Sequence, residues 1–388
     1  MSEENKSMTI KLSGRINSEN VAKVEEDIWS QLEGQDVSAL HLDASELEYI
    51  SSAGLRAILR LRKAYSDLTV ENVSPEVYEI FDVTGFTEMF TVKKAYRVVS
   101  VEGCEVIGEG ANGKVYRIDR DNVVKTYKNA DALGEIEHER EVAKLALILG
   151  VPTAISYDVA RVGDSYGSVF ELLNSRSFAK ILATEPERFD WCVKEYSDLM
   201  KLIHSIEVPE GKLPRIKEKG QRWAASVAGD LPGDYGEKLL KLIDGIPERN
   251  TMIHGDFHTK NIVLAGDEVM LIDMDTLSVG HPIFELAQIY TSFVGFGEYD
   301  PHEVSDFMGF SAELAREFWK KSLIAYLGTD DEGTVTDVEN KVRCVSYARL
   351  IDWNRRHRGD GSDSDRKARE LWTRELLELL DKLDTLVF

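Results

Sequence analysis

The sequence predicts an α/β (α+β) fold in two domains, the second of which is divided into two lobes. In the first hundred of its 388 residues, strand-like runs alternate with helical segments, which is typical of a small α/β layer fold. A glycine-rich loop between two strand-like runs follows, and a second hairpin pattern appears after residue 261. We place the first domain at residues 1–98 and the second at 99–388, with lobes at about 99–173 and 174–388.

The first domain begins with an alternating strand at 8–16, followed by a helix at about 18–31. Residues 40–43 form a second strand-like run. An apolar helix is expected from about Leu55 onward. Strands and helices therefore alternate along this domain, and a layered α/β arrangement is expected.

The second domain opens with a loop that contains Gly108, Gly110 and Gly113 and continues to Val115. This G-x-G-x-x-G-x-V spacing lets main-chain amides approach phosphates without interfering side chains. A dinucleotide-binding loop would require a helix that opens at the third glycine. The residues after Gly113 alternate instead, so we expect a hairpin.

A strand-like run at 122–127 carries Lys125 where a lysine would pair with the α- and β-phosphates of a nucleotide. A helix is expected at about 132–149, and it should carry a glutamate that faces this lysine. Three glutamates compete, at positions 137, 139 and 141. We choose Glu141, because apolar residues continue its side of the helix, and keep Glu137 in reserve.

A short apolar strand at 167–173 forms the expected connection between the lobes. Main-chain groups of Glu171 and Leu173 would then face the edge of the adenine base of a bound nucleotide. Apolar side chains would form the walls of the base site, although each could equally belong to the core: Ile107, Val115, Val123, Val263 and Ile272.

The stretch from Ile253 to Asp273 holds the residue types that phosphoryl transfer from ATP requires. Asp256 would orient and deprotonate an acceptor hydroxyl. Asn261, five positions later, and Asp273 would bind Mg²⁺ through oxygen atoms. Asp and Asn are also common in ordinary turns. Here the apolar runs between Asn261 and Asp273 predict a hairpin with the catalytic loop before it and the metal ligand after it.

Three histidines near this stretch, His254, His258 and His281, do not have the paired spacing of a helical metal site. We therefore expect them to brace loops. The three cysteines, Cys104, Cys192 and Cys344, are widely spaced and lack metal or redox spacing, which favours a reducing, cytoplasmic location. The sequence also lacks a signal-like segment and a run of about 18 apolar residues.

Residues from about 99 to 388 resemble the aminoglycoside phosphotransferase and choline kinase superfamily, whose members have a bilobal protein-kinase-like fold. The resemblance rests on His254-Gly255-Asp256 with Asn261, on Leu202–Ser205, and on Asp273–Pro282. It implies a kinase that transfers phosphate from ATP or GTP, with Mg²⁺, to a small-molecule hydroxyl. One departure is Glu285, where relatives usually carry aspartate; a glutamate could still brace the catalytic loop.

The first domain, from residue 8 to 98, resembles the STAS domain of anti-sigma-factor antagonists, chiefly in the stretch Asp43–Leu55. In phosphorylatable relatives the acceptor hydroxyl lies just before the glycine, where this chain has Ala53, and Ser51 stands at the aspartate position. Ser52 remains a candidate phosphate acceptor because it opens a helix. Helix capping by Ser51 or Ser52 is the competing interpretation.

The net charge of −22 disfavours nucleic acid and anionic membranes as partners. It mildly favours a cationic substrate, although an acidic, soluble surface explains the charge without any substrate and is the preferred interpretation.

Two functions are therefore considered. The first is a small-molecule kinase with a STAS domain that is regulatory or binds a protein partner. The second is a regulatory module that senses nucleotide or phosphorylates a protein.

Overall fold

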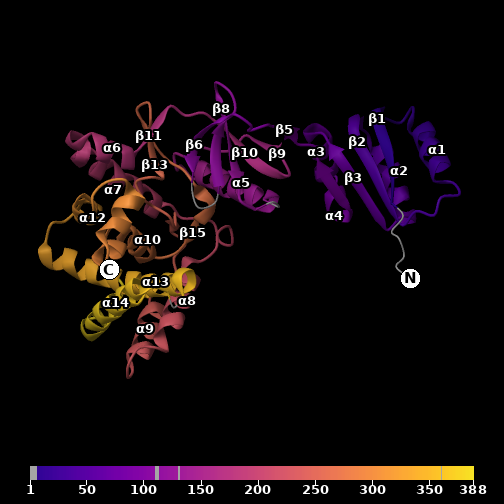
Figure 1. Ribbon diagram of the computed structural model, residues 1–388. Coiled ribbons are helices and arrows are strands. Elements are labelled where there is room, and N and C mark those ends of the chain that lie inside the picture. Colours follow the sequence, from indigo (N-terminus) through magenta and orange to yellow (C-terminus); the bar gives the residue numbers. More distant parts are fainter. Residues whose placement is uncertain (1–6, 110–112, 130–131, 360) are drawn as a thin grey trace. The chain divides into compact units, whose positions relative to one another are not determined.

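The computed structural model describes residues 7–109, 113–129, 132–359 and 361–388 (Figure 1). Its contacts divide the chain into two compact units. Unit 1 comprises residues 1–118, 124–131 and 158–169, and unit 2 comprises 119–123, 132–157 and 170–388. The boundary expected at residue 98 therefore lies within unit 1, and we describe each unit separately.

The N-terminal part of unit 1 is a four-stranded sheet in the order β1-β2-β3-β4, and all three strand pairs are parallel. Helices connect successive strands, as the alternation in the sequence predicts. The elements are β1 (Ser7–Ile16), α1 (Val21–Leu32), β2 (Ala39–Ile50), α2 (Ser52–Ala64), β3 (Asp67–Val73), α3 (Pro75–Val83), α4 (Phe86–Met89) and β4 (Thr91–Lys94).

The strand β2 is longer than the sequence indicated, because it continues through the polar segment after Asp43. Register shifts in its pairing with β1 accommodate this extension. Apolar side chains from both strands, such as Ile10, Leu40 and Leu42, are fully buried in one core together with residues of α2 and α3. This part of the chain therefore has its own hydrophobic core.

A second sheet has six strands in the order β5-β9-β10-β8-β7-β6. The expected hairpin at the glycine-rich loop is confirmed, because the two strands that flank the loop pair antiparallel. The strands are β5 (Arg97–Val98), β6 (Glu105–Glu109), β7 (Gly113–Arg117), β8 (Asn122–Tyr127), β9 (Asp158–Val162) and β10 (Ser165–Glu171).

The first helix of unit 2 is α5 (Leu133–Ile148), close to the helix predicted at 132–149. The expected hairpin after Asn261 is also confirmed, since β13 (Ile262–Ala265) and β14 (Glu268–Leu271) pair antiparallel. A short strand, β11 (Ser175–Ser177), pairs with β13, and β12 (Met252–Ile253) pairs with β15 (Ser278–Val279).

The rest of unit 2 is helical and shares one large core. Its elements are α6 (Phe178–Thr184), η1 (Pro186–Arg188), α7 (Phe189–Ser205), α8 (Ile216–Ala228), α9 (Tyr235–Asp244), η2 (Met274–Thr276), α10 (Ile283–Tyr290), η3 (Thr291–Gly295), η4 (Phe296–Glu298), α11 (Pro301–Met308), α12 (Ala312–Leu327), α13 (Glu332–Arg358) and α14 (Asp363–Lys382).

Helix α10 is buried along its whole length and packs against α13, which also packs against α8 and α14 (Figure 1). Among the described residues, no helix combines the length and hydropathy needed to cross a membrane. The short strands β12 and β15 lie next in sequence to the loops that carry the candidate site.

Candidate active site

The loop between β12 and β13 carries the predicted catalytic residue, Asp256, and a buried glutamate holds its main chain. The Glu285 carboxylate accepts hydrogen bonds from the N–H groups of His254 and Gly255, at 2.6 and 3.0 Å. Hydrogen bonds of this kind, to an ionised acceptor, are stronger than neutral ones. Glutamate at position 285 therefore braces the loop, as the sequence suggested it could.

The loop turns sharply at Gly255, whose φ of +84° is rarely adopted by other residues. A Cβ atom at this position would lie 2.7 Å from the main-chain oxygen of Thr276. The Thr276 hydroxyl in turn donates a hydrogen bond of 2.7 Å to the His254 carbonyl. This close approach joins the catalytic loop to η2, which directly follows Asp273.

The Asp256 side chain is partly exposed, so a substrate can reach it. Its Oδ2 atom lies 3.3 Å from Nε2 of His258 and accepts a 3.1 Å hydrogen bond from Nδ2 of Asn261. Burial opposes ionisation of Asp256, but the hydrogen bond and charge of His258, together with the charge of Arg349, lower its pKa to about 2. The carboxylate is therefore ionised at neutral pH, as a general base must be.

Asn261 has a second hydrogen bond from Nδ2, of 3.0 Å, to the main-chain oxygen of Asp256. Both bonds use the amide nitrogen, so the amide oxygen points away from these partners and can serve a metal ion. The Asn261 carbonyl also accepts a 2.9 Å hydrogen bond from the N–H of Ile272, the neighbour of Asp273. The two predicted metal ligands are thus tied to each other through the main chain.

Asp273 has a left-handed main-chain conformation, with φ 66° and ψ 69°. Aspartate adopts this conformation more readily than most residues, but it still costs roughly 1 kcal/mol or more. Strain of this kind concentrates at functional sites. Hydrogen bonds on both sides of Asp273, at Ile272 and at Thr276, hold the segment in place.

The three histidines brace the loops, as the sequence predicted. The buried Nδ1 of His254 accepts from the N–H of Asp256 at 3.1 Å, and that of His281 accepts from the N–H of Ile283 at 3.2 Å. His258 is buried against the ring of Phe307 and faces the Asp256 carboxylate. Burial lowers the pKa of His254, which keeps this ring neutral and able to accept its hydrogen bond.

In the glycine-rich loop, Gly113 is required by its packing. A Cβ atom at Gly113 would lie 1.7 Å from the main-chain oxygen of Thr126 on β8, whereas one at Gly108 would make ordinary contact with Val115 at 3.6 Å. Gly110 lies outside the described residues. Val115, at the end of the motif, is half-buried on β7.

Lys125 is half-buried on β8, and its Nζ atom lies 5.4 Å from the centre of the Tyr127 ring. The expectation that Glu141 lies on the packed face of α5 is wrong, because Glu141 and Glu137 are exposed and Glu139 is buried. The packed face of α5 consists of Ile136, Glu139, Val142, Ala143 and Ala146. The predicted stripe had followed Leu145 and Ile148, but Ile148 is 70% exposed.

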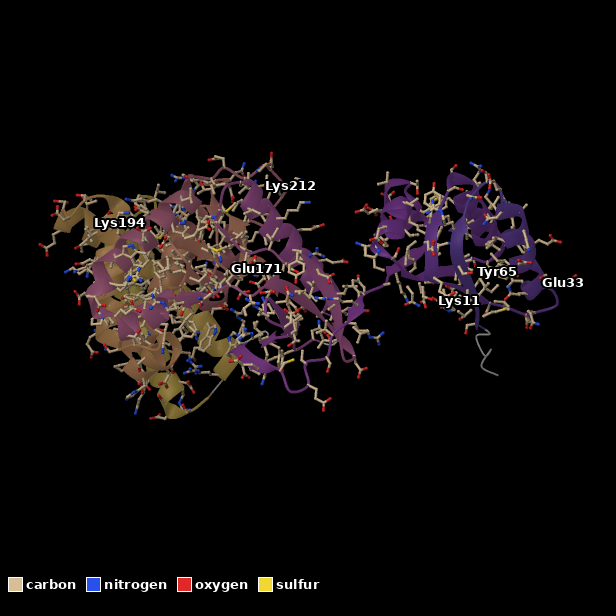
Figure 2. The ribbon with its side chains drawn as sticks, turned by 90° about the horizontal axis from the view of Figure 1, so that it is seen from above. Lys11, Glu33, Tyr65, Glu171, Lys194 and Lys212 are labelled. Carbon is tan, nitrogen blue, oxygen red and sulfur yellow. The ribbon has the colours of Figure 1, made fainter. Side chains whose placement is uncertain are left out.

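The remaining residues predicted to contact the nucleotide lie on or beside the strands β10, β13 and β14. Glu171 ends β10 with an exposed side chain (Figure 2). The Leu173 carbonyl accepts a 2.8 Å hydrogen bond from the N–H of Ser175. Val263 is buried on β13, and Ile272 is half-buried directly before Asp273.

Sequence reasoning missed Arg349, a residue of α13 whose charge acts on Asp256. No motif or short spacing connects the two residues, so the sequence carried no signal for this neighbour. Burial lowers the pKa of Arg349 to about 10, although the Asp256 carboxylate opposes this shift.

In the N-terminal part, Ser51 caps α2, since its hydroxyl accepts a hydrogen bond from the N–H of Gly54 at 3.4 Å. Ser52 is the first residue of α2, and its side chain is exposed. The capping interpretation therefore applies to Ser51.

Comparison with known proteins gives two family matches. Residues 1–99 match the STAS domain, and residues 103–316 match the phosphotransferase enzyme family. An anti-sigma factor antagonist of Bordetella bronchiseptica, BtrV, is 35% identical over 85 residues, which are 21% of this chain and 72% of BtrV.

Similar solved structures include the ternary complex of streptomycin, ATP and APH(2'')-IIa, with a TM-score of 0.47, 12% identity, and coverage of 78% of this chain and 97% of that one. A choline/ethanolamine kinase family protein from Mesorhizobium loti has a TM-score of 0.45 and 13% identity, with coverage of 72% and 88%. The sequence matches, taken with the geometry of the catalytic loop, lead to one conclusion: the chain belongs to the phosphotransferase enzyme family and carries an N-terminal STAS domain.

Proposed function

We propose that the protein transfers the terminal phosphoryl group of ATP, with Mg²⁺, to a hydroxyl group of a small molecule. The observation that carries this proposal is the pair formed by Asp256 and Asn261. The Asn261 amide nitrogen holds the Asp256 carboxylate at 3.1 Å, which leaves the amide oxygen for a metal. A base that accepts the hydroxyl proton and a metal ligand thus belong to one short loop.

Asp256 would accept a hydrogen bond from the acceptor hydroxyl and take its proton as the oxygen attacks phosphorus. With its pKa at about 2, this carboxylate is a weak base whose main contribution is to orient the hydroxyl. Asn261 and His258 keep Oδ2 in place, and the Glu285 carboxylate fixes the main chain beneath it. Positioning of this kind supplies most of the catalysis in phosphoryl transfer.

Asn261 and Asp273 would hold Mg²⁺, since both offer oxygen atoms and Asp273 adds a negative charge. The bound metal would neutralise charge on the phosphates of the nucleotide. The left-handed main-chain conformation of Asp273 fits this function, because such strain is common at residues that bind a ligand.

The nucleotide would be held by the glycine-rich loop, with Gly108, Gly110 and Gly113, and by Lys125. Glu139 replaces Glu141 as the candidate for the glutamate that positions the phosphates, because it is the glutamate on the packed face of α5. Main-chain groups of Glu171 and Leu173 would face the base. The apolar walls would include Val115, Val263 and Ile272.

The STAS domain would bind a protein partner, as its family match suggests. Ser52 is exposed at the start of α2 and remains a candidate phosphate acceptor. Mass spectrometry of the full chain after incubation with MgATP tests this: phosphate on Ser52 that is absent from Ser52→Ala would support it. The domain boundary between residues 98 and 99 also remains a proposal.

The kinase proposal is tested by ADP release from MgATP in the presence of small hydroxyl compounds. Asp256→Asn should lower acceptor-dependent turnover by about 10²–10⁴-fold and leave ATP binding within a few-fold. Asp273→Ala should in addition weaken Mg²⁺-dependent ATP binding. The matched control is Asp267→Asn, an exposed aspartate in the turn between β13 and β14. Turnover by Asp256→Asn equal to that of the control would refute the assignment.

A further inference from the structure

Helix α11 ends beside the catalytic loop and carries an exposed phenylalanine there. Phe307 is 41% exposed, and it is the only exposed residue among the phenylalanines and tryptophans that the structure describes in unit 2. Single apolar side chains are common on protein surfaces and need no explanation by themselves. The position of Phe307 is informative because of its contacts with the loop that carries Asp256.

Two residues of the catalytic loop contact the Phe307 ring. The centres of the His258 and Phe307 rings are 5.1 Å apart in an edge-to-face arrangement. The Nζ atom of Lys260 lies 4.8 Å from the centre of the same ring. Between these two residues, the Thr259 hydroxyl donates a hydrogen bond of 3.6 Å to the sulfur of Met308. Three consecutive residues of the loop thus contact the end of α11.

The rest of α11 holds this contact in place. Val304 and Met308, which stand one helical turn apart, are both buried in the core of unit 2. The guanidinium of Arg358 on α13 donates two hydrogen bonds, of 2.7 and 3.0 Å, to the two oxygens of the Glu303 carboxylate. Phe307 therefore lies at the edge of the buried face of an anchored helix.

His258 connects Phe307 to the catalytic carboxylate. The buried His258 ring contacts Phe307, and its Nε2 atom lies 3.3 Å from Oδ2 of Asp256. The Asp256 side chain is 45% exposed. A solvent-accessible carboxylate and a solvent-accessible aromatic ring therefore contact the same buried imidazole. A molecule whose hydroxyl group reaches Asp256 would have the Phe307 ring as a neighbour.

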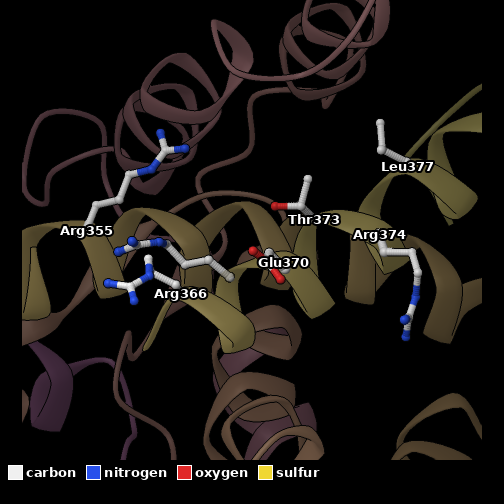
Figure 3. A pocket seen from close by; sticks show the side chains of 7 residues that line it. Arg355, Arg366, Glu370, Thr373, Arg374 and Leu377 are labelled. Carbon is white, nitrogen blue, oxygen red and sulfur yellow. The ribbon is translucent and has the colours of Figure 1, made fainter. Parts of the chain in front are cut away.

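A hollow between α13 and α14 differs from this surface (Figure 3). Four arginines line it, and its lining contains no aromatic ring. Three of these arginines are bound by protein groups: Arg355 by Asp230, Arg369 by Asn354 at 2.8 Å, and Arg374 by Glu375 at 3.2 Å. Its lining residues belong to α13 and α14, and none of them to α11 or to the catalytic loop. The hollow is therefore a weaker candidate for the acceptor than the surface at Phe307.

We propose that Phe307 determines acceptor specificity: the non-polar face of a ring in the acceptor packs on the exposed Phe307 ring, while a hydroxyl group of the same molecule reaches Asp256. The inference rests on the proposed function. The C–H face of a saturated ring and the face of an aryl ring both remove apolar surface from water when they pack on phenylalanine. Such a contact orients the acceptor hydroxyl, and orientation is the main contribution that a protein makes to phosphoryl transfer.

A role in specificity differs measurably from a role in holding His258. If Phe307 only supported His258, its loss would lower the turnover of every acceptor by the same factor. If Phe307 contacts the acceptor, its loss lowers kcat/KM for ring-containing acceptors more than for open-chain acceptors and leaves the KM for ATP unchanged. The ratio of kcat/KM between two acceptors therefore isolates the contact.

The test measures ADP release by the full chain with MgATP and two pairs of hydroxyl compounds, each pair differing by one ring. Sorbitol is compared with its cyclic counterpart, 1,5-anhydrosorbitol, and propane-1,2-diol is compared with 1-phenylethane-1,2-diol. We expect kcat/KM to be about tenfold higher, or more, for the ring-containing member of at least one pair. The pair that shows this preference distinguishes a saturated ring from an aryl ring.

In Phe307→Ala, the preference should fall to about threefold or less, and the KM for ATP should stay within about twofold. Phe307→Tyr retains the ring and should retain the preference. Ile155→Ala is the matched control, because Ile155 is 39% exposed and lies between α5 and β9. A wild type that favours the ring-containing member of neither pair, or a preference that Phe307→Ala leaves unchanged, would overturn the inference and leave the kinase proposal intact.

Failure of the kinase proposal would look different, because no hydroxyl compound would then stimulate ADP release. Saturation-transfer NMR with the same four compounds and MgATP decides the binding site in that case. Binding of a ring-containing compound to the wild type that Phe307→Ala abolishes and Phe307→Tyr retains would support the site without phosphoryl transfer. No binding to the wild type, or binding that Phe307→Ala leaves unchanged, would overturn the site as well.

Discussion

The Glu285 carboxylate accepts a 3.0 Å hydrogen bond from the N–H of Gly255, the residue directly before Asp256 in the chain. Its other oxygen accepts from the N–H of His254 at 2.6 Å. A side chain buried in α10 thus fixes the main chain of the catalytic loop. The position of the Asp256 carboxylate depends on this contact between distant segments.

The first prediction concerns Glu285→Gln. A glutamine offers one acceptor oxygen, so one of the two buried N–H groups would lose its partner, at a cost of about 1–3 kcal/mol. We expect a lower melting temperature and a fall in kcat of about 10- to 100-fold with little change in the KM for ATP. Thermal unfolding and steady-state kinetics provide the measurements.

Two further variants make this prediction specific. Glu285→Asp keeps the charge and should retain more activity than Glu285→Gln. Glu378→Gln removes an exposed carboxylate from α14 and should behave as wild type. Equal effects of the substitutions at 285 and 378 would show that the loop does not depend on Glu285.

The second prediction concerns pH and the variant Asn261→Asp. In the wild type, Asp256 has a pKa of about 2, so its ionisation should not limit kcat/KM above about pH 4. The substitution replaces the donor 3.1 Å from Asp256 with a second carboxylate, and like charges raise the pKa of such a pair. The acid limb of the pH profile should therefore move to higher pH.

Asn261→Ala serves as the control for this pH effect, because it removes the amide without adding a charge. Both variants should lose turnover. A pH profile of Asn261→Asp that coincides with that of Asn261→Ala, measured between pH 4.5 and 8, would argue against the coupling of positions 256 and 261.

The third prediction concerns the glycine-rich loop. In Gly113→Ala, the new methyl group would meet the Thr126 main-chain oxygen at 1.7 Å, so the strands β7 and β8 would have to separate. We expect destabilisation of about 1–3 kcal/mol and at least tenfold weaker ATP binding. Unfolding curves and calorimetric titration with MgATP measure the two effects.

Gly108→Ala is the matched control within the same motif, since its methyl group would make only van der Waals contact with Val115. Stability close to that of the wild type is expected. If both variants were equally stable, the close approach of β8 to Gly113 would not be the reason for a glycine at that position.

The fourth prediction concerns the pH dependence of stability. Burial lowers the pKa of His281 from 6.5 to about 4, so between these values the unfolded chain binds a proton that the folded chain does not. The contribution of neutral His281 to the free energy of unfolding is fully present above pH 6.5. It should fall, by up to about 3 kcal/mol, as the pH decreases to 4. Denaturant unfolding at several pH values measures this slope.

His281→Asn keeps an acceptor for the N–H of Ile283 and cannot take up a proton in this range. Its stability should change less steeply between pH 6.5 and 4. His138→Asn, at an exposed position on α5, is the control and should keep the slope of the wild type. A slope unaffected by His281→Asn would assign the pH dependence to other groups.

Features that depend on neighbours in sequence could be predicted well. Asn261 binds Asp256 because the two residues stand five positions apart in one loop, and the two hairpins follow from strand-like and apolar runs interrupted by turn residues. The brace by Glu285 was also anticipated from its place in a family motif. A serine cap on α2 was also expected from local helix chemistry, but only the structure assigns the cap to Ser51 and not to Ser52.

The side of α5 that packs could not be predicted, since Glu139 and Glu141 stand two positions apart and point to different faces. The apolar residue Ile148 suggested one face, yet its side chain is 70% exposed. Which face of a helix is buried depends on what lies against it, here η2 and the core of unit 2. The residues that pack against α5 lie far from it in the sequence.

The sequence by itself determined the family and predicted the catalytic loop with its candidate metal ligands, because their residue types and spacings act over a few positions. Only the tertiary structure decided that Glu285 of α10 holds the main chain of the catalytic loop and that Glu139 lies on the packed face of α5, since the packing of distant segments determines both. Charge shows the difference most clearly. The total of −22 describes the whole surface, whereas electrostatic interactions weaken with distance and are screened, so the few groups packed around a site determine which ligand it favours.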